Sequence, residues 1–171
     1  RAFTREDDTR DVPLPRPVSP LPAGARNYLT PAGAQRLKDE LRHLEAAERP
    51  RLIAAAAQAD AVGADTQEQL QRTELRIAYL QASLATAEIV TPPLPPHDVV
   101  RFGATVKVRD GKGIMNTYRI VGVDEADFAR DEVSWLSPIA RALLNARLGA
   151  RVPFKFPSGQ TELEIVGIAY E

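Results

Sequence analysis

The sequence predicts an α+β protein: an N-terminal antiparallel helical hairpin, or two-stranded coiled coil, followed by a small antiparallel β-rich domain with one short helix. Three observations support this fold. A seven-residue apolar repeat runs through residues 70–87, four prolines stand within residues 91–96, and apolar residues alternate from residue 104 onward. The 171 residues, 44% hydrophobic and 26% charged, are enough for one ordinary domain or two small ones.

Residues 1–29 are expected to form a leader outside these units. Its charged run at residues 5–8 is followed by five prolines between residues 13 and 22. Proline removes backbone donors and favours polyproline II, so this stretch cannot build a core alone. Two interpretations stay open: a mobile tail, or a strap that lies on this protein or on a partner.

Residues 30–90 are expected to form the hairpin. Thr30 is a suitable N-cap and Pro31 a suitable first helical residue. The first helix places its leucines on one face, at Leu37, Leu41 and Leu44. Pro50 lies inside this pattern and is expected to kink the helix, because it lacks a backbone donor.

The second helix carries the clearer pattern. Gly63 is expected to stop the first helix, and Thr66 with Gln69 resembles a capping box that opens the second. Two heptad series follow, namely Leu70, Ile77, Leu84 and Thr73, Leu80, Ala87. Two long helices joined by a short connection run antiparallel, and an arm over residues 66–89 would measure roughly 35 Å.

Residues 91–96 are expected to form a stiff proline linker, and residues 97–171 the β-rich domain. The alternation predicts five strands, at residues 104–108, 117–123, 133–136, 152–156 and 163–170. Ser137 and Pro138 predict the start of a helix that continues through Leu144.

Composition excludes several classes of protein. The absence of cysteine excludes a disulfide scaffold, a thiolate metal site and a cysteine nucleophile. The net charge of −1 argues against a protein that coats DNA through counterion release. No apolar run approaches the roughly 20 residues that cross a bilayer, and no signal peptide is visible. We therefore expect a cytoplasmic protein without a membrane partner.

The distal end of the hairpin is predicted to be acidic. Between Arg51 and Arg72 there is no basic residue, and the acidic residues in this interval are Asp60, Asp65 and Glu68. A protruding acidic tip suits contact with a metal ion or with a basic cavity. Helix-connecting segments also favour aspartate and threonine for capping alone, so a purely structural role stays open.

Nine short blocks follow one another along residues 28–171. They occupy residues 28–33, 37–41, 48–50, 87–90, 102–106, 118–122, 124–127, 137–144 and 168–171. As an ordered set these blocks resemble the bacterial GreA/GreB transcript-cleavage factors. The leader is similar to that of the extended GreB-like branch.

The resemblance implies an FKBP-like C-terminal domain and a partner, RNA polymerase. Members of this family dock that domain at the rim of the polymerase secondary channel and insert the hairpin toward the active centre. Acidic residues at the tip then help to hold a second Mg²⁺, which suits two-metal phosphoryl chemistry. The implied factor is not itself an enzyme, has no cofactor of its own, and contacts RNA only indirectly within the elongation complex.

The tip departs from the pattern of cleavage-active relatives, which carry Asp-x-x-Glu-Asn-Ala-(Glu or Asp)-Tyr. Asp65 and Glu68 keep the first spacing, but Gln69 and Leu70 stand where Asn-Ala is expected. The span from Pro50 to Ile77 is also shorter, by about one turn in each arm. We therefore expect docking with weak or altered cleavage stimulation.

Any metal site at the tip is assigned to Asp65 and Glu68, with Asp60 as a further candidate, and only together with polymerase. The alternative is a fully active cleavage factor in which Asp65 and Glu68 hold the second Mg²⁺.

The resemblance places the docking surface around Ser137, Pro138 and Arg141. Relatives often carry an acidic residue before the Ser-Pro pair, whereas this chain carries Leu136, preceded by Trp135. Strand alternation turns one of these two side chains outward, where it would suit an interface anchor. A second interpretation is that both pack within the domain.

Other classes of function have weaker support. An FKBP-like shape suggests prolyl isomerisation, but that activity needs an aromatic-lined pocket, and the core is expected to use most aromatic side chains of the domain. The apolar seam is already used between the two helices, so a monomer is expected. Residues 97–171 carry 10 basic and 10 acidic residues, which argues against direct duplex DNA binding.

Overall fold

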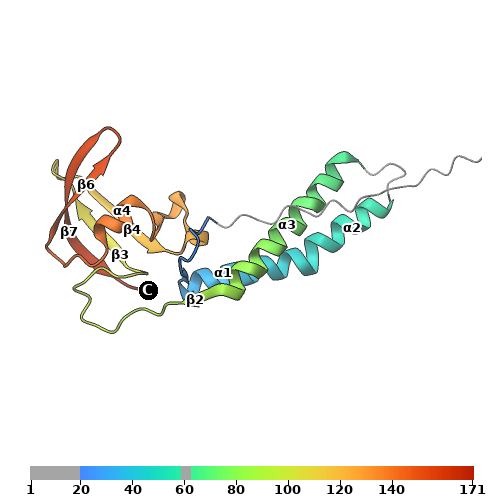
Figure 1. The fold of residues 1–171 in the computed structure, drawn as a ribbon, viewed down its shortest axis with the longest axis horizontal. Helices are drawn as coiled ribbons and strands as arrows, with labels where there is room; N and C mark the ends of the chain where they lie inside the picture. The colour runs from blue at the N-terminus through green and yellow to red at the C-terminus, as the bar shows by residue number, and fades with distance from the viewer. Residues whose placement is uncertain (1–19, 59–62) are drawn as a thin grey trace, which may run out of the picture.

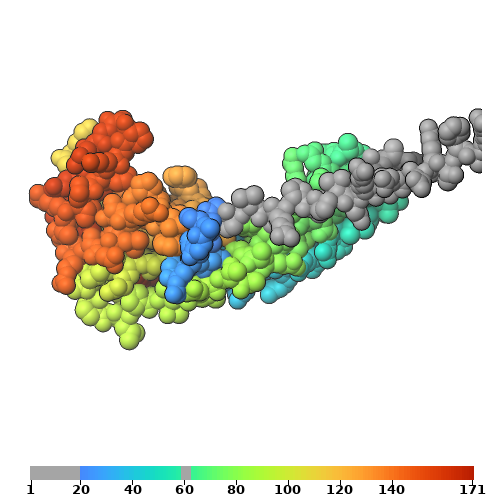
Figure 2. Space-filling view, viewed as in Figure 1, coloured from blue at the N-terminus to red at the C-terminus, as the bar shows by residue number. Residues whose placement is uncertain are grey.

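The computed structural model describes residues 20–58 and 63–171. The expectations for residues 1–19 and for Asp60 lie outside these described residues. The hairpin extends from one side of the β-rich domain as a long arm (Figure 1). In the space-filling view the first described residues lie at the waist between the two parts (Figure 2).

The hairpin consists of two arms. The first contains α1 (Pro31–His43), the π-helical segment η1 (Leu44–Glu48) and α2 (Arg49–Gln58), and the second is α3 (Ala64–Thr86). Thr30 caps α1 as predicted, because its hydroxyl accepts a hydrogen bond from the Gly33 backbone amide at 3.0 Å. The 23 residues of α3 give an arm of about 35 Å.

A π-helical segment lies directly before Pro50, where a kink was expected. The Arg49 amide donates to the carbonyl of Leu44, five residues back. This wider turn makes room for a proline ring, which would otherwise meet the carbonyl four residues earlier. Leu52 follows Leu44 by eight residues, which in a regular α-helix would place the two side chains about 80° apart around the helix axis. The wider turn makes these eight residues equivalent to seven α-helical ones, so the side chains lie only about 20° apart. Leu52 therefore stays on the seam, with 2% of its surface exposed.

The predicted start of α3 is wrong in detail. Gly63, expected to stop the first helix, is instead the N-cap of α3, and its carbonyl accepts from the amides of Thr66 and Gln67. Thr66 and Gln69 form no capping box, because the helix has already begun at Ala64. The Gln69 amide donates to Asp65 at 3.0 Å.

A two-stranded parallel sheet closes the base of the hairpin. β1 (Asn27–Leu29) lies in the segment predicted as leader, and β2 (Ala87–Ile89) lies where the second helix was expected to continue. Leu29 is fully buried with residues of both helices, and this cluster consists of Leu29, Ala34, Leu37 and Leu80. The last residues of the predicted leader are thus part of the folded hairpin.

The C-terminal domain is a five-stranded sheet in the order β5-β4-β3-β7-β6. Its elements are β3 (Thr105–Arg109), β4 (Met115–Val121), η2 (Val123–Glu125), η3 (Phe128–Arg130), β5 (Glu132–Ser134), α4 (Pro138–Leu143), β6 (Arg151–Phe156) and β7 (Gly159–Ala169). The sheet is antiparallel as predicted except at one edge, where β5 pairs parallel to β4. Two 3₁₀ turns between these strands carry the chain back so that both strands run the same way.

One edge of this sheet contains a proline. Within residues 20–58 and 63–171, β6 pairs only with β7, and the exposed Pro153 lies opposite Glu162 in that pairing. Proline has no backbone N–H, so it is tolerated at an edge strand and would weaken a central one. Among the described residues no helix is long and apolar enough to cross a membrane.

Candidate functional site

The acidic residues predicted at the tip lie on the first turns of α3. Asp65 accepts a hydrogen bond from Gln69, and Glu68 forms an ion pair with Arg72 at 2.5 Å. Both carboxylates are exposed. An acidic side chain in the first turn interacts favourably with the positive end of the helix dipole, which gives Asp65 a stabilising role independent of any metal.

The tip supplies few ligands for a metal. Among the described residues no group of three histidine, aspartate or glutamate side chains gathers to hold an ion. Asp65 and Glu68 are hard oxygen ligands of the kind that Mg²⁺ prefers, but Arg72 competes for one of them. Their chemistry therefore fits a shared ion that takes most of its ligands from elsewhere.

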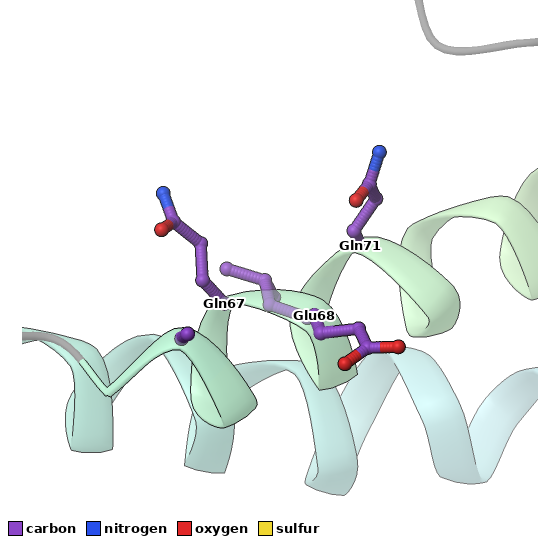
Figure 3. A pocket seen from close by; sticks show the side chains of 5 residues that line it. Gln67, Glu68 and Gln71 are labelled. Carbon is purple, nitrogen blue, oxygen red and sulfur yellow. The ribbon is translucent and has the colours of Figure 1, made fainter.

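Two glutamines at the tip, Gln67 and Gln71, were not among the predicted site residues. Gln67 and Gln71 extend from one side of α3, away from α2, while Glu68 lies along the helix (Figure 3). They line a shallow hollow with Ala64, Glu68 and Leu70. The surface that the tip presents on this side is therefore mainly uncharged. Their spacing of four residues, which places two side chains on one face of a helix, is the feature of the sequence that could have identified them.

The predicted docking segment forms the start of α4. The Ser137 hydroxyl accepts from the Ala140 amide at 3.3 Å, and Pro138 occupies the first turn, as predicted. Pro138 and Arg141 are exposed, and Leu136 is half-buried. The structure thus brings Leu136, Ser137, Pro138 and Arg141 together on one turn and its entry.

Trp135 is placed differently from a free interface anchor. Its ring packs against the domain core and meets the ring of Tyr28 edge-on, with centroids 5.2 Å apart. Its indole Nε1 is buried and has no hydrogen-bond partner among the described residues. Leu136 lies outside the core cluster and its packed neighbours, so of the two it is the less engaged within this domain.

Removal of the Ser137 hydroxyl tests the cap of this segment. Ser137→Ala is expected to lower the free energy of unfolding by about 1 kcal/mol, because the first turn of α4 loses its side-chain acceptor. Ser137→Asp retains an acceptor and is expected to stay near the parent. Chemical denaturation checks both, and equal losses in the two variants would contradict a capping role.

A junction between the two parts was missed by the sequence analysis. Tyr28 of β1 lies between Phe102, at a centroid distance of 5.7 Å, and Trp135. Beside this aromatic contact, three carboxylates of the segment after β4 reach residues of the hairpin; they are Asp124, Glu125 and Glu132. The sequence offers no signal that separates these buried or half-buried acids from exposed ones.

The outer part of the junction consists of ion pairs. Arg36 of α1 reaches Glu132 with two nitrogens at 3.3 and 3.2 Å. Arg76 of α3 reaches Glu40 of α1 at 2.7 and 2.9 Å, and these hydrogen bonds raise the pKa of the guanidinium. The Arg76 bridge links the two arms near their base, and it contributes modestly because its partners are partly exposed.

Comparisons with known proteins cover both parts. Residues 27–89 match the family described as "Transcription elongation factor, N-terminal", and residues 95–170 match "Transcription elongation factor, GreA/GreB, C-term". The chain is 39% identical over 154 residues to transcription elongation factor GreB of Neisseria meningitidis serogroup A, covering 85% of this chain and 94% of that protein.

It is also 42% identical over 158 residues to transcription elongation factor GreA of Thioalkalivibrio sulfidiphilus, covering 85% and 99% of the two chains. Among solved structures it is similar to a GreA/GreB elongation factor from Nitrosomonas europaea, with 22% identity, coverage of 85% and 99%, and a TM-score of 0.41. It is likewise similar to GreA factor homolog 1 of Thermus thermophilus, with 24% identity, coverage of 85% and 99%, and a TM-score of 0.39.

Proposed function

Because this chain belongs to the GreA/GreB family of transcription elongation factors, we propose that it binds RNA polymerase through its C-terminal domain and inserts its hairpin into the secondary channel. The turn that contains Leu136, Pro138 and Arg141 docks the factor. The tip of the hairpin then occupies the channel and stimulates RNA cleavage weakly or in an altered way. The factor acts in the cytoplasm as a monomer, and its contact with RNA is made within the elongation complex.

One observation carries the weak-cleavage part of the proposal. Each described tip carboxylate is already engaged by a neighbour on its own helix, Asp65 by Gln69 and Glu68 by Arg72. A metal held by both oxygens of Glu68 would have to displace the Arg72 guanidinium, which donates to Oε1 at 2.5 Å. Mg²⁺ demands a nearly ideal arrangement of oxygen ligands, so such a tip is a poor donor of a second metal site.

The chemistry of cleavage belongs to the polymerase in this proposal. A Mg²⁺ in the polymerase active centre would activate the attacking water and stabilise the leaving oxygen. Asp65 and Glu68 would add at most two ligand groups to its shell. The chain itself is proposed to have no catalytic activity.

A stalled, backtracked elongation complex with 3′-labelled RNA tests the proposal. The factor is added with Mg²⁺, alone or together with a cleavage-active GreA or GreB. Loss of the competitor's cleavage with few new short fragments is the expected result. Strong fragment release by the factor alone would instead make it a fully active cleavage factor. If the factor neither released fragments nor reduced the competitor's cleavage, the docking proposal would be overturned.

The tip carboxylates have their own test. Asp65→Ala with Glu68→Ala is expected to reduce any residual cleavage stimulation to the rate without factor, because the only described tip ligands are lost. Competition with the active factor is expected to stay within about twofold, since docking uses the other domain.

A matched control is Asp39→Ala with Glu48→Ala, which removes two acids that each pair with an arginine one turn away on the first arm. Cleavage is expected to persist in this control. Equal loss in both double variants would show that general charge on the hairpin, rather than the tip, supports cleavage.

A further inference from the structure

A buried carboxylate lies where the hairpin meets the C-terminal domain. Glu125 has 5% of its surface exposed. Its Oε2 accepts from the backbone amide of Thr30 at 3.0 Å and from that of Gly122 at 2.7 Å, and its Oε1 accepts from the Thr30 hydroxyl. One side chain thus joins the segment that enters α1 to the segment that leaves β4.

This carboxylate also continues into the first helix. The Thr30 hydroxyl that donates to Glu125 accepts in turn from the Gly33 amide at 3.0 Å. The hydroxyl that caps the N-terminus of α1 therefore also donates a hydrogen bond to a carboxylate of the C-terminal domain. Such a cap fixes the helix end in both position and direction, because each hydrogen bond in the series is directional.

Two neighbouring acids hold other points of the hairpin. Asp124 accepts from the hydroxyls of Tyr79 and Ser83 on α3, the latter at 2.5 Å. Glu132 accepts from Arg36 on α1. Contacts at separate points on two helices oppose rotation of the arm. Glu125 and Glu132 are equally buried, each 5% exposed, but the donors to Glu125 are buried with it, whereas the Arg36 side chain that reaches Glu132 is 40% exposed.

We propose that Glu125 is a positioning residue that sets the direction in which the hairpin leaves the C-terminal domain. The consequence for polymerase rests on the proposed function. An arm of about 35 Å that turns by about 10° moves its tip by about 6 Å. A factor held at its docking surface would then miss the channel, although both of its parts remain folded.

The absence of cysteine allows the direction to be measured. Spin labels are attached at Gln71→Cys on the hairpin and Arg147→Cys on the C-terminal domain, both exposed positions. The distance between the labels is measured in the full chain by double electron–electron resonance. The parent is expected to give one narrow distribution. Glu125→Ala is expected to broaden it or to displace its maximum by more than 5 Å.

A conservative variant separates position from charge. In Glu125→Gln the amide oxygen still accepts from the backbone amides, and the amide nitrogen donates to the Thr30 hydroxyl, which has a free lone pair. This variant is expected to restore most of the narrow distribution. Glu162→Ala, which removes an exposed acid of β7, is expected to leave the distribution unchanged.

Circular dichroism is used to check whether Glu125→Ala retains its helix content. If it is lost, Tyr79→Phe with Ser83→Ala removes the donors to Asp124 instead and is expected to produce a smaller broadening. A parent distribution that is already broad would overturn the proposal. An unchanged distribution in a folded Glu125→Ala would also overturn it. If the Tyr79→Phe and Ser83→Ala variant is measured instead, an unchanged distribution in that variant would overturn it.

Binding and channel effect are measured on the unlabelled variants. Glu125→Ala is expected to bind polymerase within about threefold of the parent, while its competition with an active cleavage factor falls at least tenfold. Equal changes in the affinity for polymerase and in the competition with the cleavage factor would contradict a positioning role. A parent that fails to bind polymerase would refute the proposed function, and the label distances would still decide the role of Glu125.

Discussion

Gly33→Ala is expected to destabilise the protein by about 3 kcal/mol, although alanine usually stabilises a helix relative to glycine by up to about 1 kcal/mol. The sign reverses because of the junction. A β-carbon at this position would lie 1.7 Å from Glu125 Oε1 and 2.1 Å from its Cδ. The buried carboxylate would have to leave the Thr30 amide and hydroxyl, so packing and hydrogen bonds are lost together.

Urea denaturation followed by circular dichroism measures this change. Gly111→Ala is the matched control, because the nearest atom to its added β-carbon is Thr161 Oγ1 at 3.9 Å. That variant is expected to lie within about 0.5 kcal/mol of the parent. A neutral or stabilising Gly33→Ala would mean that the helix and the C-terminal domain do not meet as described.

Leu136→Asp combined with Arg141→Glu is expected to weaken binding to RNA polymerase at least about thirtyfold. Loss of a central apolar anchor and of an arginine typically costs 2 kcal/mol or more at an interface, and about 1.4 kcal/mol corresponds to a factor of ten. Neither side chain belongs to the domain core, so the fold is expected to survive. Fluorescence anisotropy of labelled factor titrated with core polymerase measures the affinity.

The same charge change elsewhere on the domain is the control. Leu148→Asp with Arg147→Glu alters an exposed leucine, 50% accessible, and its neighbouring arginine. Binding is expected to remain within about threefold. If both double variants lose affinity equally, docking responds to the overall charge of the domain and the α4 turn has no special role.

The parts of the fold that were predicted correctly depend on local chemistry. Thr30 and Ser137 each cap a helix that has proline in its first turn, and their hydroxyls bond as expected. The alternating strands also formed close to their predicted residues, because a half-buried strand imposes a period of two on its own sequence. Each of these signals lies within one short stretch of chain.

The errors concern contacts between distant residues. Pairing of Asn27–Leu29 with Ala87–Ile89 joins segments about sixty residues apart. Neither segment contains a sequence pattern that indicates which strand it pairs with. The parallel edge of the sheet depends on how the chain returns after β4, which alternation does not encode. The wide turn before Pro50 compensates for the spacing between Leu44 and Leu52, which becomes visible only once the seam is built.

The candidate site divides in the same way. Asp65 and Glu68 were found because their charge stands out in a long interval without basic residues, and Ser137 and Pro138 because they open a helix. Glu125 was not singled out, since its importance comes from Thr30, ninety-five positions away. Trp135 proved to be packed against Tyr28, a contact that no spacing within the C-terminal domain predicts.

Pro153 has a consequence for the behaviour of many copies at once. An exposed edge strand is a template on which another chain can add a strand, and repetition of that step leads to fibres. At Pro153 the free edge of β6 lacks a donor, so an incoming strand meets a break in the ladder of hydrogen bonds. The same residue that limits β6 to an edge position therefore hinders the addition of a strand along this edge of the sheet when the protein is concentrated or newly synthesised.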